Sequence, residues 1–416
     1  MSYQRFGTPK IYVDNVNWLL NSGNISTTDI TTSGVSVASG SSSIELFDMK
    51  PSNLQTISAN GSSDRFVITI NTTLNTDAQQ DTNFIAILGH NLNSAGAKMM
   101  VQLDDSSVFT TPTNDSLTSL TNVVNAEALA DVDTGTNLGS DINDSTTTIP
   151  VESTHGSKFS EGDLIKVKRV GGEADETMYV TNISSDNLTV IREVNSTSAS
   201  TFSAGDNIFF TGYTQPAKNG WSLATFTQSS DNQHIRIIFD PNGSNTDTFS
   251  SDIKIGAILI GETLSLKSPD LSISKSFSFE GVNRQTSVGG QTYANATYVR
   301  GANWFLEPFF NSTNTSPLLR SKTGRVNLNM NFSYMDDTEV YSENLYGATS
   351  ISSTNSIYNN MIAKTNSGMF PMLFQYDSST ATDKDSFLWC RLASDPSFTQ
   401  VANRVWNTSI NLIEEF

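Results

Sequence analysis

Apolar and polar residues alternate along several stretches of the chain. In Val326–Tyr334 every second residue is apolar and the residues between are Asn or Ser, and Leu271–Phe279 shows a similar pattern. A period of two residues predicts antiparallel strands with one buried face. The apolar run Phe84–Leu88 indicates a buried strand. Helical periodicity is confined to Asp337–Tyr346 and Ser356–Lys364, so the chain is predicted to be all-β, with several β-sandwiches and short helices.

Turn signals and linker composition divide this β-pattern into three units. Residues 1–138 and 212–264 are predicted to form one larger sandwich. Residues 139–211 carry short, closely spaced strands, two of which follow a Gly-Asp turn signal at Gly162-Asp163 and Gly205-Asp206, and are interpreted as a small β-barrel inserted between two strands of that sandwich. Residues 265–416 are predicted to form a C-terminal sandwich with the short helices and a Gly-containing hairpin arm. A length of 416 residues suits this count, at roughly 150 residues per domain.

Composition and charge exclude several classes of function. The formal net charge of −18 would repel phosphates, so neither nucleic acid nor an anionic membrane surface is an expected partner. No apolar run reaches the roughly 20 residues that span a bilayer, so no membrane insertion is expected. The single cysteine, Cys390, allows neither an internal disulfide nor a cysteine-ligated zinc site. With no recognisable signal peptide, the chain is expected to be made and assembled in a reducing cytosol.

The sequence carries no motif for catalysis, and we expect no enzyme, cofactor or metal site. The three histidines, His90, His155 and His234, do not fall in metal-binding spacings, and neither a nucleophile elbow nor a phosphate-binding loop is present. The carboxylate pairs Asp104-Asp105 and Asp336-Asp337 are interpreted as solvated loop residues, with Ca²⁺ binding by the first pair as the alternative. Tryptophans 221, 304, 389 and 406 and Cys390 are predicted to belong to cores.

His90 and Asn91 are the candidate ligand-facing residues. They follow the predicted buried strand Phe84–Leu88 and precede a turn. The pattern favours a hydrogen-bonded turn histidine, and a sugar-facing role for the two residues is the alternative.

The larger sandwich resembles a galactose-binding-like, discoidin-type jelly roll. The resemblance rests on Asn83–Leu92, on Gln233–Phe239 and on Ile255–Glu262. In that family one strand ends in Gly and a polar residue, and a later strand reads apolar-Arg-apolar. The resemblance implies a jelly-roll fold for the first 264 residues, less the insertion, and a possible host glycan as ligand.

The order of segments also resembles tail proteins of tailed bacteriophages, in particular distal-tail and tail-tube-like proteins near the baseplate. The matching segments are Pro9–Asp14, Leu88–Leu92, the strands around Trp304, Val326–Phe332, Met372–Phe374 and Leu388–Arg391, and the closing Val405–Leu412. Between them lies an arm with Arg284, Gly289, Gly290 and Tyr293. The resemblance implies rings of β-sandwiches without an active site, in which such an arm contacts a neighbour.

These observations predict a structural protein of a phage virion, a tail or baseplate ring subunit. Its partners would be further copies of the chain in a ring and other tail proteins, after assembly in the bacterial cytoplasm. The alternative is a carbohydrate- or receptor-binding module of the particle, and an enzyme acting on polysaccharide is a third interpretation. A ring subunit needs its C-terminal unit for assembly, a lectin-like module binds glycan through its first unit, and an enzyme loses activity on a single carboxylate change.

Overall fold

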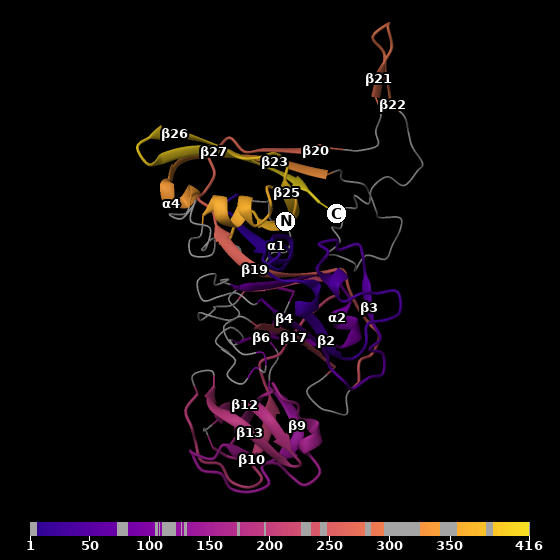
Figure 1. Ribbon diagram of the computed structural model, residues 1–416, viewed down its shortest axis with the longest axis vertical. Coiled ribbons are helices and arrows are strands. Elements are labelled where there is room, and N and C mark those ends of the chain that lie inside the picture. The colour runs from indigo at the N-terminus through magenta and orange to yellow at the C-terminus, as the bar shows by residue number, and fades with distance from the viewer. Residues whose placement is uncertain are drawn as a thin grey trace.

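A computed structural model of the chain describes residues 6–72, 82–104, 107, 109, 122–125, 127–128, 131–172, 175–194, 197–225, 234–241, 248–278, 284–294, 325–341, 356–379 and 386–415. Asp105, Phe279 and Trp304 lie outside the described residues. The molecule is elongated, with the sheet of residues 132–210 at one end and long C-terminal strands at the other (Figure 1). The prediction of an all-β protein with several antiparallel sheets is confirmed.

The largest sheet among the described residues has eleven strands. Their order is β20-β23-β27-β25-β24-β1-β19-β5-β16-β7, and β26 pairs with β27. The strands are β1 (Lys10–Asp14), β5 (Phe84–His90), β7 (Asn122–Val124), β16 (Gly220–Thr225), β19 (Ala257–Ser265), β20 (Ser274–Ser278), β23 (Arg325–Asp336), β24 (Met372–Gln375), β25 (Phe387–Leu392), β26 (Ser397–Ala402) and β27 (Val405–Glu414).

A second sheet packs on strands β19, β5 and β16 of the first and completes a sandwich. Its order is β2-β4-β17-β6-β15-β8, built from β2 (Ile30–Gly34), β4 (Phe66–Asn71), β17 (His234–Asp240), β6 (Lys98–Asp104), β15 (Thr214–Gln215) and β8 (Glu127–Ala128). Ile85 and Ile87 of β5 point into the core between the sheets, while Phe84, Ala86 and Leu88 enter a second core on the opposite face. Burial on both faces explains the continuous apolar run of this strand.

The third sheet is the inserted unit. Its order is β10-β13-β12-β11-β14-β9, built from β10 (Thr148–Pro150), β13 (Asn187–Val194), β12 (Asp175–Ser184), β11 (Leu164–Lys168), β14 (Asn207–Phe210) and β9 (Val132–Asn137). The expected small barrel is corrected here, because the described edge strands β9 and β10 form no ladder with each other. They approach at one isolated bridge between Leu138 and Val151.

Strands on either side of this insert share the same sheets. β16 and β19, which follow it in sequence, both pair with β5, and β17 pairs with β4 and β6. The large sheet also continues beyond residue 264, because β1 pairs with β19 on one side and with β24 on the other. The N-terminal sandwich and the C-terminal strands are therefore joined by main-chain hydrogen bonds across β1.

The remaining elements are short. Two small ladders pair β3 (Gln55–Ile57) with β18 (Ile253–Ile255), and β21 (Arg284–Thr286) with β22 (Thr292–Ala294). The helical elements are α1 (Val16–Ser22), α2 (Leu92–Ala95), α4 (Asp337–Val340), the 3₁₀ turns η1 (Thr27–Asp29), η2 (Ile44–Phe47) and η3 (Gly156–Lys158), and the π-helix η5 (Ile357–Ala363). Within the described ranges, no helix combines the length and apolar character needed to cross a membrane.

The two predicted helices are confirmed in position and corrected in form. α4 ends at Val340 because Tyr341 is extended, and residues 342–346 lie outside the described ranges. The second segment is the π-helix η5, and Ser356 caps it by accepting a hydrogen bond from the backbone N–H of Asn359 at 3.2 Å.

The predicted face of Val326–Tyr334 is correct for its central residues and wrong at its end. Leu328, Met330 and Phe332 are buried, whereas Tyr334 is 74% exposed. The register between β23 and β27 shifts between Phe332 and Met335, and Tyr334 has a φ of 55°. This bulge turns Tyr334 outward and buries Met335 in its place.

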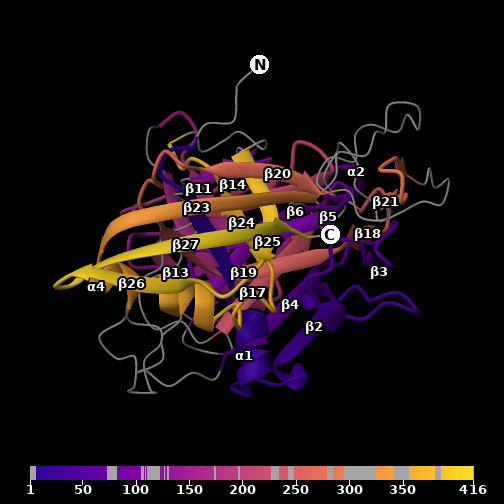
Figure 2. The ribbon, with the colours of Figure 1, turned by 90° about the horizontal axis from the view of Figure 1, so that it is seen from above.

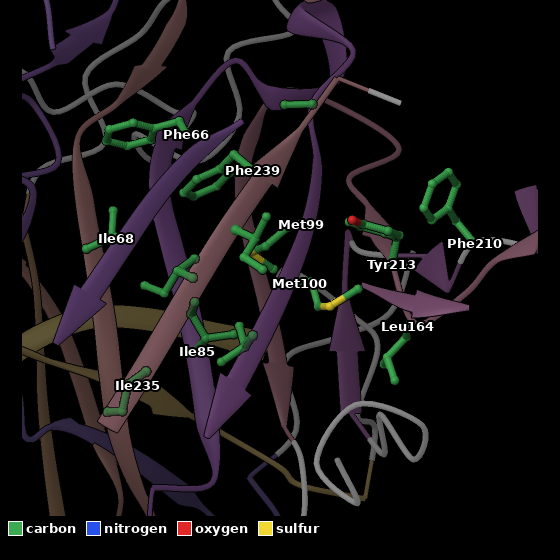
Figure 3. Close-up of a cluster of buried hydrophobic side chains, with 14 of the residues drawn as sticks. Phe66, Ile68, Ile85, Met99, Met100, Leu164, Phe210, Tyr213, Ile235 and Phe239 are labelled. Atoms are coloured by element: carbon green, nitrogen blue, oxygen red, sulfur yellow. The ribbon is translucent and has the colours of Figure 1, made fainter. Parts of the chain in front are cut away.

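The insert rests on the outer side of the second sheet. Met100 of β6, Leu164 of β11, Phe210 of β14 and Tyr213 belong to one continuous cluster with the sandwich core. In Figure 3, Met100, Tyr213 and Leu164 lie between the sandwich strands and the insert. Apolar packing therefore fixes the inserted unit against the sandwich, in addition to the chain connections.

Candidate functional site: an assembly surface and a polar cleft

The predicted arm residues lie on a hairpin, here called the hairpin arm (Arg284–Ala294). Arg284 and Tyr293 lie on its two strands, where Gln285 pairs with Tyr293 and Arg284 with Ala294. Gly289 and Gly290 lie in the turn, which closes through a hydrogen bond from Gly290 N–H to the Ser287 carbonyl at 2.9 Å. Gly290 has a φ of 82°, a conformation that glycine adopts without the steric cost of a Cβ.

The hairpin arm is exposed. It stands away from the rest of the molecule at one corner of Figure 1, and β21 and β22 pair only with each other in the described part of the chain. Val288 at its tip is fully exposed and Tyr293 is 60% exposed. An extended segment with apolar side chains in water is a feature of docking segments.

β20 forms one edge of the large sheet. Among the described strands it pairs with β23 alone, and none of its five residues is buried, with Phe277 53% exposed. Leu271, just before it, is fully exposed, so the expectation of a half-buried strand at Leu271–Phe279 is wrong for Leu271 and Phe277, whereas Ile273 packs against the C-terminal core. An unprotected sheet edge offers backbone donors and acceptors to another strand.

Beside this edge lies a face made of amide and hydroxyl side chains, here called the polar sheet face. It spans β20, β23 and β27, which lie side by side in Figure 2. The ladder places Ser274 opposite Asn329 and Asn329 opposite Asn411, and it places Asn331 opposite Ser409. None of these side chains is buried, and none is charged. The polar sheet face is therefore hydrated and uncharged in a strongly acidic protein.

His90 and Asn91 make their hydrogen bonds inside the protein. His90 is 3% exposed, and its Nε2 lies 2.8 Å from the Ser222 hydroxyl. Its Nδ1 accepts a bond from the backbone N–H of Leu92 at 3.3 Å. The Asn91 side chain binds the backbone of β18 through the Asp252 carbonyl and the Lys254 N–H. The sugar-facing role of these two residues stays a prediction.

Burial changes the protonation of several groups. Desolvation lowers the pKa of His90 to about 3 and raises that of Asp14 to about 6. It also raises the pKa of the Cys390 thiol, which is completely buried on β25. A raised thiol pKa disfavours the nucleophilic thiolate, in agreement with the interpretation of Cys390 as a small core residue.

The tryptophans that the structure describes, and Asp104, are buried or half-buried. Trp221 and Trp389 are buried as predicted, while Trp406 is half-buried and donates to Asp337. Asp104 ends β6 and is fully buried, so its interpretation as a solvated loop residue is wrong. No group of His, Cys, Asp or Glu that could hold a metal ion occurs among the described residues.

A polar cleft of about 460 Å³ lies between the sandwich and the insert. Its sandwich side includes Val67, Thr69 and Arg236, and its insert side includes Lys158 and Glu161. Sequence reasoning missed this site. The signal that points to it is Arg236 itself, a cation within the otherwise apolar run of β17.

An ion cluster in the wall of the cleft, which Arg65 and Asp240 line, joins the two units. The guanidinium of Arg65 forms ion pairs with Asp163 of the insert and Asp240 of the sandwich, and Nη2 also donates to the Tyr213 hydroxyl at 3.1 Å. These negative neighbours raise the pKa of Arg65 despite its burial. Arg65 is therefore neutralised locally and serves to hold the insert against the sandwich.

No protein-family model and no curated protein matches this chain. The functional interpretation therefore rests on the residues and their geometry.

Proposed function

We propose that this protein is a structural assembly subunit whose C-terminal strands join it to further copies of the chain. The observation that carries the proposal is the distribution of exposed apolar side chains. Nine large apolar residues are exposed among those the structure describes, and seven of them belong to residues 265–416: Leu271, Phe277, Val288, Tyr293, Tyr334, Met369 and Val401. Protein–protein contact sites expose apolar side chains, and residues 265–416 carry most of the large exposed ones among the described residues.

The charge distribution supports the same unit as the contact region. Residues 265–416 contain 11 of the 24 Lys and Arg but only 13 of the 42 Asp and Glu, so they are close to neutral. Nearly all of the net charge of −18 belongs to residues 1–264. Copies that meet through the C-terminal unit avoid most of the repulsion that the acidic remainder would cause.

The sheet edge and the hairpin arm provide two kinds of contact. The β20 edge can add a strand from a neighbour by main-chain hydrogen bonding, and the arm can reach over the neighbour's surface. An edge that docks on a different surface of the next copy makes a head-to-tail interface, and such an interface forms a ring when the rotation between copies closes and an open filament when it does not. The resemblance to distal-tail and tail-tube-like proteins supports a ring in the tail or baseplate of a bacteriophage as the setting.

The test is the mass of the full-length protein in solution, with point variants in the arm. Val288→Asp places a charge at the exposed tip, where it disturbs no buried contact. Val170→Asp is the matched control, because Val170 is 65% exposed on the insert. Light scattering over a concentration series should show a discrete multimer for the wild type and the control, and a lower mass for Val288→Asp.

Point variants are sharper than a chain cut after Leu264, because β1 pairs with β24 and the cut would expose a new edge. Electron micrographs of the wild-type multimer should show closed rings. A wild-type protein that stays monomeric at high concentration would contradict the proposal. Equal loss of mass in Val288→Asp and Val170→Asp would contradict the role of the arm.

A further inference from the structure

The cleft between the sandwich and the insert has the size of a small-molecule site and a lining of polar and charged side chains. Its volume of about 460 Å³ falls in the range of roughly 300–1,000 Å³ that is typical of small-molecule sites. The outer face of β2, β4 and β17 forms one side, and the η3 turn with the residues after it forms the other. Side chains from two different sheets thus converge on one space.

The guanidinium of Arg236 is fixed by its contacts but forms no ion pair with a carboxylate in the described structure. Its Nε donates to Gln102 Oε1 at 2.8 Å, and Nη2 donates to the same oxygen and to the Tyr179 hydroxyl at 3.0 Å. Its guanidinium carbon lies 4.1 Å from the ring centroid of Phe109. These contacts fix the planar group in place but do not neutralise its charge, and a partly desolvated cation favours an anion.

Lys158 provides a second cation on the insert side of the cleft. Its Nζ donates to the backbone carbonyls of Gly135 at 2.6 Å and of Thr134 at 3.3 Å. As with Arg236, no acidic side chain pairs with it among the described residues. Arg65 differs from both, because Asp163 and Asp240 neutralise it. The cleft therefore has two positive groups available to a ligand.

The rest of the lining favours hydroxyl groups on the ligand. Hydroxyl side chains surround the cations: Ser33, Ser63, Thr69, Ser157 and Ser160. Asp64 and Glu161 also line the cleft and are exposed. Exposed carboxylates repel a compact dianion but accept hydrogen bonds from sugar hydroxyls. The lining thus suits a molecule with many hydroxyls and one carboxylate per unit.

We propose that this cleft binds an acidic saccharide, a short oligosaccharide that carries a sugar carboxylate. The carboxylate pairs with Arg236 and Lys158, and the sugar hydroxyls bind the serines and the two exposed carboxylates. This binding function is separate from assembly, because the cleft lies on the insert and the sandwich rather than on the C-terminal strands. It gives a subunit in a particle a way to recognise an acidic polysaccharide surface.

The experiment is a calorimetric titration of the full-length protein with three acidic probes and their neutral partners. The probes are oligomers of glucuronate, galacturonate and N-acetylneuraminate, and the controls are the same sugars with the carboxylate reduced to an alcohol. At least one acidic probe should bind, and its reduced partner should bind at least tenfold more weakly, because a charge-assisted pair is lost. The variants Arg236→Lys and Lys158→Gln should each weaken binding at least tenfold.

The control variant is Arg169→Gln, which removes an exposed positive charge from the insert outside the cleft lining. It should bind the probe as the wild type does, and thermal unfolding of each variant reports on its folding. Lys158 is partly exposed, so its variant keeps the test valid if Arg236→Lys unfolds. The proposal is overturned if no acidic probe binds, if reduced sugars bind equally, or if both cleft variants bind normally. Equal binding of inorganic sulfate would overturn the assignment to saccharide.

Discussion

Acid should destabilise the protein, because the hydrogen bonds and burial of His90 favour its neutral form. The Ser222 hydroxyl donates its proton to the Asn125 carbonyl at 2.8 Å, so it accepts from His90 Nε2. Nδ1 already accepts from Leu92 N–H, and a second proton there would face that donor. Burial and these two hydrogen bonds hold the imidazole neutral, and its pKa is lowered to about 3.

The size of the effect follows from proton linkage. An unfolded histidine has a pKa near 6.5, so between about pH 6.5 and pH 3 the unfolded state binds one more proton than the folded state. The stabilisation is complete above pH 6.5 and declines by about 1.4 kcal/mol for each pH unit below it. From pH 6.5 to pH 4.5 the loss is about 2–3 kcal/mol.

Asp14 changes the pH dependence of the free energy of unfolding in the opposite direction. Its pKa is raised to about 6, so below that value the folded state takes up a proton before the unfolded state does. The variant His90→Gln separates the two contributions, because it removes the histidine and leaves Asp14 in place. The difference between wild type and variant in pH dependence then belongs to His90.

The assay combines histidine ring NMR with urea unfolding at pH 7 and pH 4.5. The ring signal that disappears in His90→Gln should not shift between these pH values. The free energy of unfolding should fall by about 2–3 kcal/mol more in the wild type than in the variant. A ring titration centred near pH 6.5 would refute the reasoning and would place His90 in contact with solvent, as a ligand-facing role requires.

Two further predictions concern buried groups. Lys364 pairs with Glu262 in the core, where Asn360 also binds the carboxylate at 2.8 Å, and the two charged side chains are 0% and 2% exposed. Lys364→Met should cost about 3–5 kcal/mol in chemical unfolding, because it leaves a buried charge, and adding Glu262→Gln should restore part of the loss. A cost below about 1 kcal/mol would contradict this account. Cys390 should react with a thiol reagent only as fast as the protein opens, and labelling of the native protein at the rate of a free thiol would show that the core around it is accessible.

Alternation in the sequence predicted the fold class because it reports on which side of a strand is buried. It succeeded for Leu328, Met330 and Phe332, which belong to the C-terminal core. It failed at Tyr334, where a β-bulge changes which side of the sheet the side chain faces. The alternation of apolar and polar residues in the sequence gives no sign of this bulge. It also failed for β20, because an apolar residue on an edge strand has the same pattern whether or not a partner covers it.

The candidate sites were less predictable because they depend on contacts between distant segments. The hairpin arm could be found from Gly289 and Gly290, which is a local turn signal. The cleft could not, since Arg236 and Lys158 come together only through the docking of the insert. The apolar strand around Arg236 was visible in the sequence. Whether a carboxylate neutralises the charge of Arg236 depends on the tertiary structure, which the sequence does not show.

The position of β1 has a consequence for how the molecule is made. Lys10 lies opposite Ser265 on one side and Gln375 on the other. Strand β1 can therefore pair only after β19 and β24, which the ribosome produces much later, have been made. Contacts between such distant segments slow folding, because long loops must close first. The large sheet is therefore completed only after β24, β25 and β27 have been made, and the same late step brings the C-terminal edge into place. Incomplete chains would lack that edge, so the order of synthesis itself keeps unfinished subunits from joining their neighbours.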